Sequence, residues 1–417
     1  MRIWVERLRV WGGAGWRVAA LTAVAVGAIW AMALIVREMR ISSWRGELID
    51  GGFPADYAQK LAELKFRHPK WCFEPLRVDD LTWSDVVEKE CTAGWNLVAC
   101  TTWAPTGWER LGSANYTPYY AANARAYDSG AWYQASREAI AYFMDPRNFF
   151  NEADIFMFES LDYDAESQTQ ELVESVLAQT FMANACYDGG DRRFSELLVD
   201  IGRRRGISPV FLAGRLSSEQ GTGSVQARGV IGDSLFELST NRIGKVGNSL
   251  VWGQTYTFGG KKTAAVLAKG RAAYNGYYNF FNIGAFGMGL FEIRYNAWRE
   301  AVSAETTAKY LGPWKTQARA IEGGAIRIKE RYIDTCRHTR YLQKFSVSPG
   351  AGVFRWKQYM QNIGAPLSES RKTSAAYDAV DSLDRPCRFV IPVYRNMPAA
   401  PSADPAKGRS AYSPTRS

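Results

Sequence analysis

A carboxylate occupies an unusual position at the end of one predicted helix. The segment Ser208–Gly221 reads SPVFLAGRLSSEQG, in which Ser and Pro are typical of a helix start and Gly of a helix end. Leu212, Leu216 and Glu219 fall at positions i, i+4 and i+7, so an acid continues the apolar stripe of the helix. Burial and the negative end of the helix dipole both favour a neutral carboxyl group. We therefore expect a raised pKa for Glu219, which suits a general acid at neutral pH.

Two other interpretations of Glu219 remain open from its position alone. The side chain could be solvated at a frayed helix end. It could also pair with Arg215, four residues earlier, and such a pair would lower its pKa.

A second segment combines aromatic and amide side chains. Tyr274–Phe286 reads YNGYYNFFNIGAF, with six aromatic residues, three Asn and two Gly among thirteen positions. Neither a buried element nor a solvated loop suits that composition, so we expect a surface that offers flat apolar faces beside amide groups. Core packing is the alternative for some of the rings, with Phe280 and Phe286 the candidates.

Composition and charge limit the class of protein. The chain has 417 residues, of which 47% are hydrophobic and 22% charged, so most of it should fold. Its net charge of +9 favours an anionic partner, either lipid head groups or an acidic wall polymer. No basic run or nucleic-acid motif occurs, so we predict no nucleic-acid partner. Two histidines and the absence of a C-x-x-C pattern predict no metal site.

An apolar segment near the amino terminus predicts a membrane anchor. Val18–Val36 contains nineteen residues without a charge, which is close to the length that spans a bilayer. Four arginines precede it, whereas the charges that follow it nearly balance. This asymmetry places residues 1–15 in the cytoplasm and the chain after residue 37 outside. A cleaved signal peptide, with a cleavage site at Ala31–Ala33, is the alternative.

The exported part divides by composition. We predict a transmembrane anchor at 16–36, a mixed α/β region at 37–134, a mainly helical domain at 135–396 and a disordered tail at 397–417. Within the helical domain, Gln220–Gly260 is rich in Gly, Ser and Thr and is predicted to be a loop or a β-hairpin excursion. All six cysteines follow the anchor, which allows disulfides, for example Cys91–Cys100; free thiols are the alternative.

Several segments in order resemble glycoside hydrolase family 73, the endo-β-N-acetylglucosaminidases that cut peptidoglycan. DPRNFFNEADIFMFE (Asp145–Glu159) resembles the family's DPRNFLNE-x-x-IFQFE, and SPVFLAGRLSSEQG resembles SPYHLASRIRQEQG. GYYNFFNIGA (Gly276–Ala285) stands in the same form in the family. Later matches are GPWKTQARAIEGGAIRIKERYI, TRYLQKFSV and QYMQNI, and the resemblance runs from about Gly52 to about Tyr377.

The resemblance implies a mainly α (α+β) fold with a lysozyme-like catalytic domain and a small β-hairpin excursion. It implies that Glu219 is the proton donor and that the aromatic segment lines a glycan groove. The side chains expected to contact sugar there are Tyr277, Tyr278, Asn279, Phe281 and Asn282. No metal or organic cofactor is implied.

This sequence also departs from the family pattern. The segment between Glu219 and Gly276 is longer than in compact members. A second catalytic carboxylate is expected on a hairpin downstream of Glu219, and Asp233 and Glu237 are the candidates before Glu292. Both acids could instead be solvated loop charges.

The resulting hypothesis is a membrane-anchored hydrolase of GlcNAc-β-1,4-MurNAc bonds, with peptidoglycan glycan strands as its partner. A muramidase or a lytic transglycosylase on the same fold is one alternative. A non-catalytic wall-binding scaffold, which keeps the groove without turnover, is another.

Overall fold

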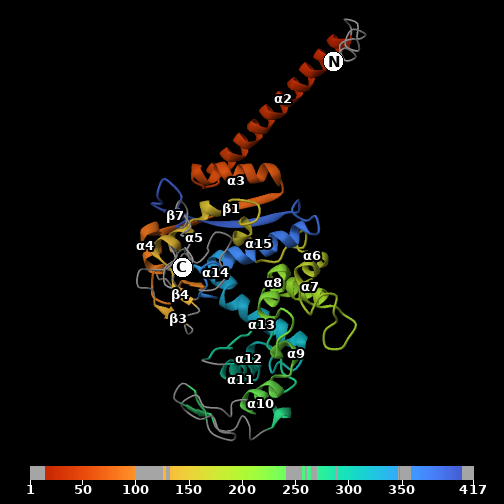
Figure 1. Ribbon diagram of the computed structural model, residues 1–417, viewed down its shortest axis with the longest axis vertical. Coiled ribbons are helices and arrows are strands. Elements are labelled where there is room, and N and C mark those ends of the chain that lie inside the picture. The colour runs from red at the N-terminus through yellow and green to blue at the C-terminus, as the bar shows by residue number, and fades with distance from the viewer. Residues whose placement is uncertain are drawn as a thin grey trace, which may run out of the picture.

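The structure is a computed structural model that describes residues 15–99, 125–127, 132–240, 256–258, 261–263, 270–287, 290–345, 347 and 358–405. Its first element is a long helix, α2 (Gly15–Asp50), which projects from the rest of the molecule (Figure 1). The portion Ala20–Asp50 is long and apolar enough to cross a membrane, and its most apolar stretch is not buried. From Ile41 onward the helix begins to bury side chains, because it packs against α3 (Ala55–Arg67).

The mixed region and the helical domain share one sheet. β1 (Trp71–Thr82) runs parallel to β7 (Cys387–Arg395), with Trp71 opposite Cys387. Since parallel strands need a crossover between them, the helical part of the chain forms that crossover. Trp71 and Phe389 pack ring to ring in a hydrophobic core that continues from α3 into the helices. The two regions therefore form one body around a common core.

Short helices make up most of that body. They are α4 (Trp83–Glu90), α5 (Arg137–Met144), α6 (Gln170–Leu177), α7 (Phe194–Arg205), α8 (Pro209–Gln220), α9 (Val225–Arg228), α10 (Ile231–Thr240), α11 (Leu290–Ala301), α12 (Ala304–Lys309), α13 (Gln317–Arg331), α14 (Arg340–Lys344) and α15 (Ala365–Asp378). Short 3-10 helices lie at Pro146–Phe149, Ile155–Phe158, Arg271–Ala273 and Ile333–Thr335. The mainly helical fold class is thus confirmed.

The remaining strands form two small antiparallel sheets. β2 (Leu97–Ala99), β4 (Trp132–Gln134) and β3 (Ala126–Tyr127) are ordered β2-β4-β3. β5 (Tyr256–Phe258) and β6 (Lys261–Thr263) form the hairpin that the sequence predicted.

The prediction for Gln220–Gly260 contains the first strand of this hairpin, whereas the second strand begins just beyond it. The first half of the predicted segment is helical instead, and residues 241–255 lie outside the described part. Ser224 begins α9, because its hydroxyl accepts from Gln226 N at 3.2 Å. In α10, Ile231 and Leu235 stand four residues apart and are both buried in a small core of their own with Phe291. This helical spacing was hidden by the Gly, Ser and Thr content of the segment.

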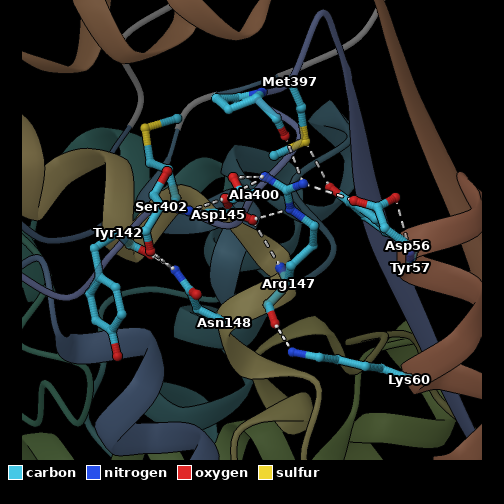
Figure 2. Close-up of polar contacts among 12 residues, drawn as sticks. Asp56, Tyr57, Lys60, Tyr142, Asp145, Arg147, Asn148, Met397, Ala400 and Ser402 are labelled. Carbon is cyan, nitrogen blue, oxygen red and sulfur yellow. Dashed lines mark hydrogen bonds and ion pairs between the residues drawn. The ribbon is translucent and has the colours of Figure 1, made fainter.

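A buried arginine joins three distant segments of the chain (Figure 2). Arg147 is 2% exposed and forms an ion pair with Asp145, which is fully buried, at 2.8 Å. Its other terminal nitrogen pairs with Asp56 of α3, also at 2.8 Å. The guanidinium further donates to Pro398 O at 2.9 Å and to Ala400 O at 3.1 Å. One side chain thereby ties α3 and the carboxy-terminal segment to the helical domain.

The prediction of disorder from residue 397 is accordingly wrong for the part of the tail that the structure describes. Asn148 donates to Ser402 O at 2.9 Å, and Ser402 N donates to Asp145 at 2.8 Å. The tail makes these contacts through its backbone groups, so its side-chain composition could not predict them. Residues 406–417 lie outside the described part.

The five cysteines that the structure describes are free thiols: Cys72, Cys91, Cys186, Cys336 and Cys387. Cys100 lies outside the described residues, so the predicted pairing of Cys91 with Cys100 stays a prediction.

We predict that Arg147→Met lowers the free energy of unfolding by about 3–5 kcal/mol, because it leaves the Asp145 carboxylate buried without its cation. Chemical denaturation of the full chain in detergent measures this. Lys60→Met is the matched control: exposed Lys60 donates to Arg147 O at 3.1 Å, and its loss should change stability by less than about 1 kcal/mol. Equal effects of the two substitutions would contradict the structural role of Arg147.

Candidate active site

The helix that carries Glu219 forms as its sequence predicts. Ser208 caps α8, because its hydroxyl accepts from Phe211 N at 3.1 Å, and Pro209 occupies the first turn. Gly221 ends the helix with a φ of +48°, a conformation that favours glycine. Leu212 and Leu216 are fully buried. Glu219, one turn further on the same face, is half-buried and reaches a cavity at the helix end.

The cavity has a volume of about 310 Å³. Besides Glu219, the cavity is lined by the aromatic segment (Tyr274–Phe286), by α13 together with Tyr332, and by Tyr359. The lining residues are Glu219, Phe281, Asn282, Ile283, Gly284, Ala285, Arg327, Ile328, Arg331, Tyr332 and Tyr359.

Asn282 holds the carboxyl group of Glu219. Its side-chain nitrogen donates to Glu219 Oε2 at 2.9 Å and to the backbone oxygen of the same residue at 3.3 Å. Asn282 has a φ of +49°, a left-handed conformation that Asn tolerates better than most residues. The Tyr359 side chain lines the same cavity and acts to lower the pKa of the carboxyl group. The hydrogen bond from Asn282 fixes the orientation of the carboxyl group.

Burial raises the pKa of Glu219 above its ordinary value. The hydrogen bond from Asn282 acts against this shift, as does the charge of Arg215, while the charge of Glu369 adds to it. Burial outweighs the opposing effects. A carboxyl group of this kind retains its proton to a higher pH than a solvated Glu and can act as a general acid.

Arg215 does not form the ion pair with Glu219 that one interpretation of the sequence allowed. Its guanidinium pairs with Glu369 of α15 at 2.6 Å and donates to Gln343 of α14 at 3.0 Å. It also lies 3.8 Å from the ring centroid of Tyr359, a distance typical of a cation–π contact. Arg215 thus supports the wall of the cavity and leaves the Glu219 carboxyl group open to it.

Asn279, a predicted sugar contact, is a structural residue instead. It is 2% exposed, and its side-chain nitrogen donates to Ile283 O at 2.8 Å and to Ala297 O at 3.0 Å. Its side-chain oxygen accepts from Ile283 N at 2.9 Å. Every polar atom of the amide is used to shape the loop that carries Asn282, so none remains for a ligand. The composition of the segment could not distinguish the two asparagines.

The aromatic residues of this segment divide between core and surface. Of the two candidates for core packing, Phe280 is fully buried, whereas Phe286 is 66% exposed. Phe281 is 3% exposed and packs on Gly324, where an added Cβ would come within 2.3 Å of the ring; its ring also lines the cavity. Tyr277 and Tyr278 are half-buried and lie outside the cavity lining.

The structure does not bring the two candidates for a second carboxylate to Glu219. Asp233 and Glu237 stand on helix α10, not on a hairpin, and neither lines the cavity. Asp233 pairs with Arg271 at 3.0 Å, with the two side chains 41% and 50% exposed. Glu237 is exposed. Among the described residues, Glu219 is the one carboxylate that lines this cavity.

Sequence reasoning missed Tyr359, Tyr332 and the two arginines of α13 as site residues. Tyr359 stands in the QYMQNI motif, which gave a signal without indicating which residue faces the site. Arg327 and Arg331 are four residues apart, and that spacing alone could have placed both on one helix face. No group of three His, Cys, Asp or Glu side chains is positioned to hold a metal ion in the described parts of the chain.

Comparison with known proteins yields similarity at the level of solved structures. No family model matches the chain, and no curated protein matches it. Glucosaminidase B of S. aureus is 19% identical, with 78% of this chain and 94% of that chain covered and a TM-score of 0.41. A major bifunctional autolysin is 15% identical, with 78% and 98% covered and a TM-score of 0.41.

A third structure, autolysin E of S. aureus in complex with the muropeptide NAM-L-Ala-D-iGlu, is 14% identical, with 76% and 99% covered and a TM-score of 0.41. All three are glucosaminidases or autolysins, the group that the sequence motifs resemble. The identities and TM-scores are too low to carry a functional conclusion.

We predict that Asn282→Gly, which keeps the positive φ accessible, raises the pKa of Glu219 further, because it removes a hydrogen bond that favours the ionised form. The alkaline limb of the profile of kcat/KM against pH should then move to higher pH. Asn396→Gly is the matched control, since Asn396 also has a positive φ (59°) and is exposed away from the cavity. An unchanged limb in Asn282→Gly would show that another group controls it.

Proposed function

We propose that this chain is an endo-β-N-acetylglucosaminidase that hydrolyses GlcNAc-β-1,4-MurNAc bonds in peptidoglycan. The observation that carries the proposal is Glu219, a carboxyl group with a raised pKa that is held by Asn282 in a cavity also lined by Tyr359. The family motifs surround this residue on both sides.

In the first step of the proposed reaction, Glu219 donates its proton to the glycosidic oxygen. The bond between that oxygen and C1 of the GlcNAc unit breaks, the leaving sugar departs as a neutral alcohol, and positive charge develops at C1 and the ring oxygen. Glu219 becomes a carboxylate. Asn282 then stabilises it through its hydrogen bond, and Arg215 through its charge.

The second step needs a group that attacks C1. Since Glu219 is the one carboxylate lining the cavity among the described residues, we favour attack by the carbonyl oxygen of the substrate's own N-acetyl group. Water would then add to C1 and reopen the ring so formed, and the Glu219 carboxylate would accept the proton of that water. A water molecule activated by Asp233 or Glu237 is the alternative, and variants of these two residues decide between the routes.

The aromatic segment supplies the proposed sugar contacts. Phe281 and Asn282 line the cavity and would contact the sugars at the cleaved bond. Tyr277 and Tyr278 lie just before them in the chain, and we propose that they contact sugars further along the strand. Tyr278 also stacks on Phe280 and closely approaches Gly229, so part of its ring supports the fold.

Helix α2 is the proposed membrane anchor, with the catalytic body outside the cytoplasm. The apolar stretch and the arginines before it support this topology. We predict that protease added to spheroplasts removes the body, whereas protease confined to the cytoplasmic side does not. Protection of the body in spheroplasts would refute the topology.

We predict that Glu219→Gln lowers turnover on purified wall material by at least about 10²–10⁴-fold, because the transferable proton is lost. Tm should stay level or rise at pH 8. The raised pKa means that ionisation of Glu219 destabilises the folded chain, and this loss grows as the pH rises from the unfolded pKa through the folded one. Near or below pH 4 the two proteins should melt alike.

Asp233→Asn and Glu237→Gln are parallel variants for this experiment. Under the N-acetyl route each should retain turnover within about threefold, whereas a loss as large as that of Glu219→Gln would identify the second carboxylate. The released fragments identify the reaction by mass spectrometry. A GlcNAc reducing end supports the proposal, whereas a MurNAc or anhydroMurNAc end indicates a muramidase or a lytic transglycosylase. A wild-type protein that binds wall glycan without releasing fragments would be a scaffold.

A further inference from the structure

Helix α13 places two arginines on the wall of the Glu219 cavity. Arg327, Ile328 and Arg331 occupy positions i, i+1 and i+4 of this helix and all line the cavity. The described side chains that are charged and line it are Glu219, Arg327 and Arg331. The proposed reaction uses neither arginine, so their charges require another explanation.

The charge of Arg327 is used within the protein. Its guanidinium forms an ion pair with Glu300 of α11, and both side chains are mostly buried. Glu300 also accepts from the Thr306 hydroxyl at 2.8 Å, and Arg327 lies 5.3 Å from the centroid of the Tyr310 ring. Arg327 therefore joins α11, α12 and α13 and has no charge to spare for a ligand.

Arg331 differs from Arg327 in this respect. It is exposed, and no carboxylate in the described part of the chain pairs with it. The nearest acids along the chain are engaged elsewhere, since Asp334 pairs with Lys329 and Glu330 accepts from the Tyr310 hydroxyl at 3.1 Å. The cavity thus has one uncompensated positive charge at its exposed edge whenever Glu219 holds its proton.

Aromatic packing orients this charge. The guanidinium of Arg331 lies 5.8 Å from the centroid of the Tyr332 ring. Tyr332 is 7% exposed, and its ring packs edge to face against Tyr359, which lines the same cavity as Glu219. Arg331 is therefore packed on the aromatic wall of the cavity that contains the proposed proton donor.

We propose that Arg331 binds a carboxylate of the substrate at the edge of the Glu219 cavity. This inference rests on the proposed function for the identity of the glycan. In wall glycans a carboxylate comes either from the free lactyl group of MurNAc or from the peptide attached to it, whereas polymers of GlcNAc alone have none. A guanidinium offers two parallel N–H donors, which match the two oxygens of a carboxylate. The site would thus prefer anionic wall glycans over uncharged ones.

The preference should be visible as binding, independent of turnover. Affinity is measured by calorimetry in the full-length Glu219→Gln protein in detergent, with three probes built on the same GlcNAc-MurNAc tetrasaccharide. One has free lactyl carboxylates, one has these reduced to alcohols, and one carries peptide. We expect the carboxylate form to bind about 10- to 100-fold more tightly than the alcohol form. If the peptide supplies the carboxylate, the peptide-bearing probe binds best and the first two bind alike.

Adding Arg331→Gln should reduce this preference to about threefold or less, and Arg331→Lys should retain part of it, because the charge remains without the second donor. Arg395→Gln is the matched control, since Arg395 is an exposed residue at the end of β7, away from α13 (Figure 1). In a protein with Glu219 intact, Arg331→Gln should raise KM for the charged glycan and leave kcat within about twofold.

Three results would overturn the inference. Equal binding of all three probes by the parent protein would show that no carboxylate subsite exists. An equal loss for both probes in Arg331→Gln would show a structural role, and an equal loss in Arg395→Gln would show a general effect of net charge. Failure of the proposed function is a separate result. The charge preference is measured by binding, so it can be tested even if the protein has no glycosidase activity.

Discussion

The burial of the Glu219 carboxyl group is the constraint on which the site depends. Leu212 and Leu216 fix the face of α8 that turns inward, so the side chain one turn later is also partly removed from water. An ionised carboxylate in that position loses hydration, and Asn282 and Tyr359 compensate for part of this loss. The uncompensated part appears as the raised pKa of Glu219. The same loss of hydration therefore makes Glu219 a suitable general acid and destabilises the folded chain when Glu219 is ionised.

Arg215 makes this compromise possible by standing next to Glu219 without neutralising it. Its ion pair with Glu369 and its hydrogen bond to Gln343 tie α8 to α15 and α14. Arg215 lowers the pKa of Glu219 less than burial raises it, and the charge of Glu369 raises that pKa as well. A direct Arg215–Glu219 pair, one turn apart on the helix, would have produced an ordinary ionised surface glutamate. The position of α15 therefore matters to the acid although it contributes no side chain to the cavity.

Much of the fold was predictable where local rules decide it. The boundaries of α8 follow from Ser208, Pro209 and Gly221, and the buried face of α3 follows from the spacing of Tyr57 and Leu61. Prediction from sequence failed where the structure of a segment depends on contacts with residues far away in the chain. The tail is ordered because its backbone meets Arg147, which lies about 250 residues earlier, and no pattern in the tail records that.

The candidate site shows the same division. Glu219 and Asn282 were found from helical spacing and the family motif, and the structure joins them by a hydrogen bond. Asn279 and Asn282 are the same residue type three positions apart, yet the backbone turns one inward and the other toward the carboxyl group. Arg331 was missed because an unpaired charge is recognised only when the partners of its neighbours are known.

The continuity of α2 has a mechanical consequence. The helix passes without interruption from its apolar portion to Ile41 and Leu48, which are already packed on the body. At about 1.5 Å per residue, the distance from Val36 to Ile41 is only about 8 Å. With α2 anchored in a bilayer, the body would be rigidly coupled to the membrane helix and would not move independently on a flexible linker. Tilting or turning the helix would redirect the cavity, and the depth of wall within its reach would be set by the fold itself.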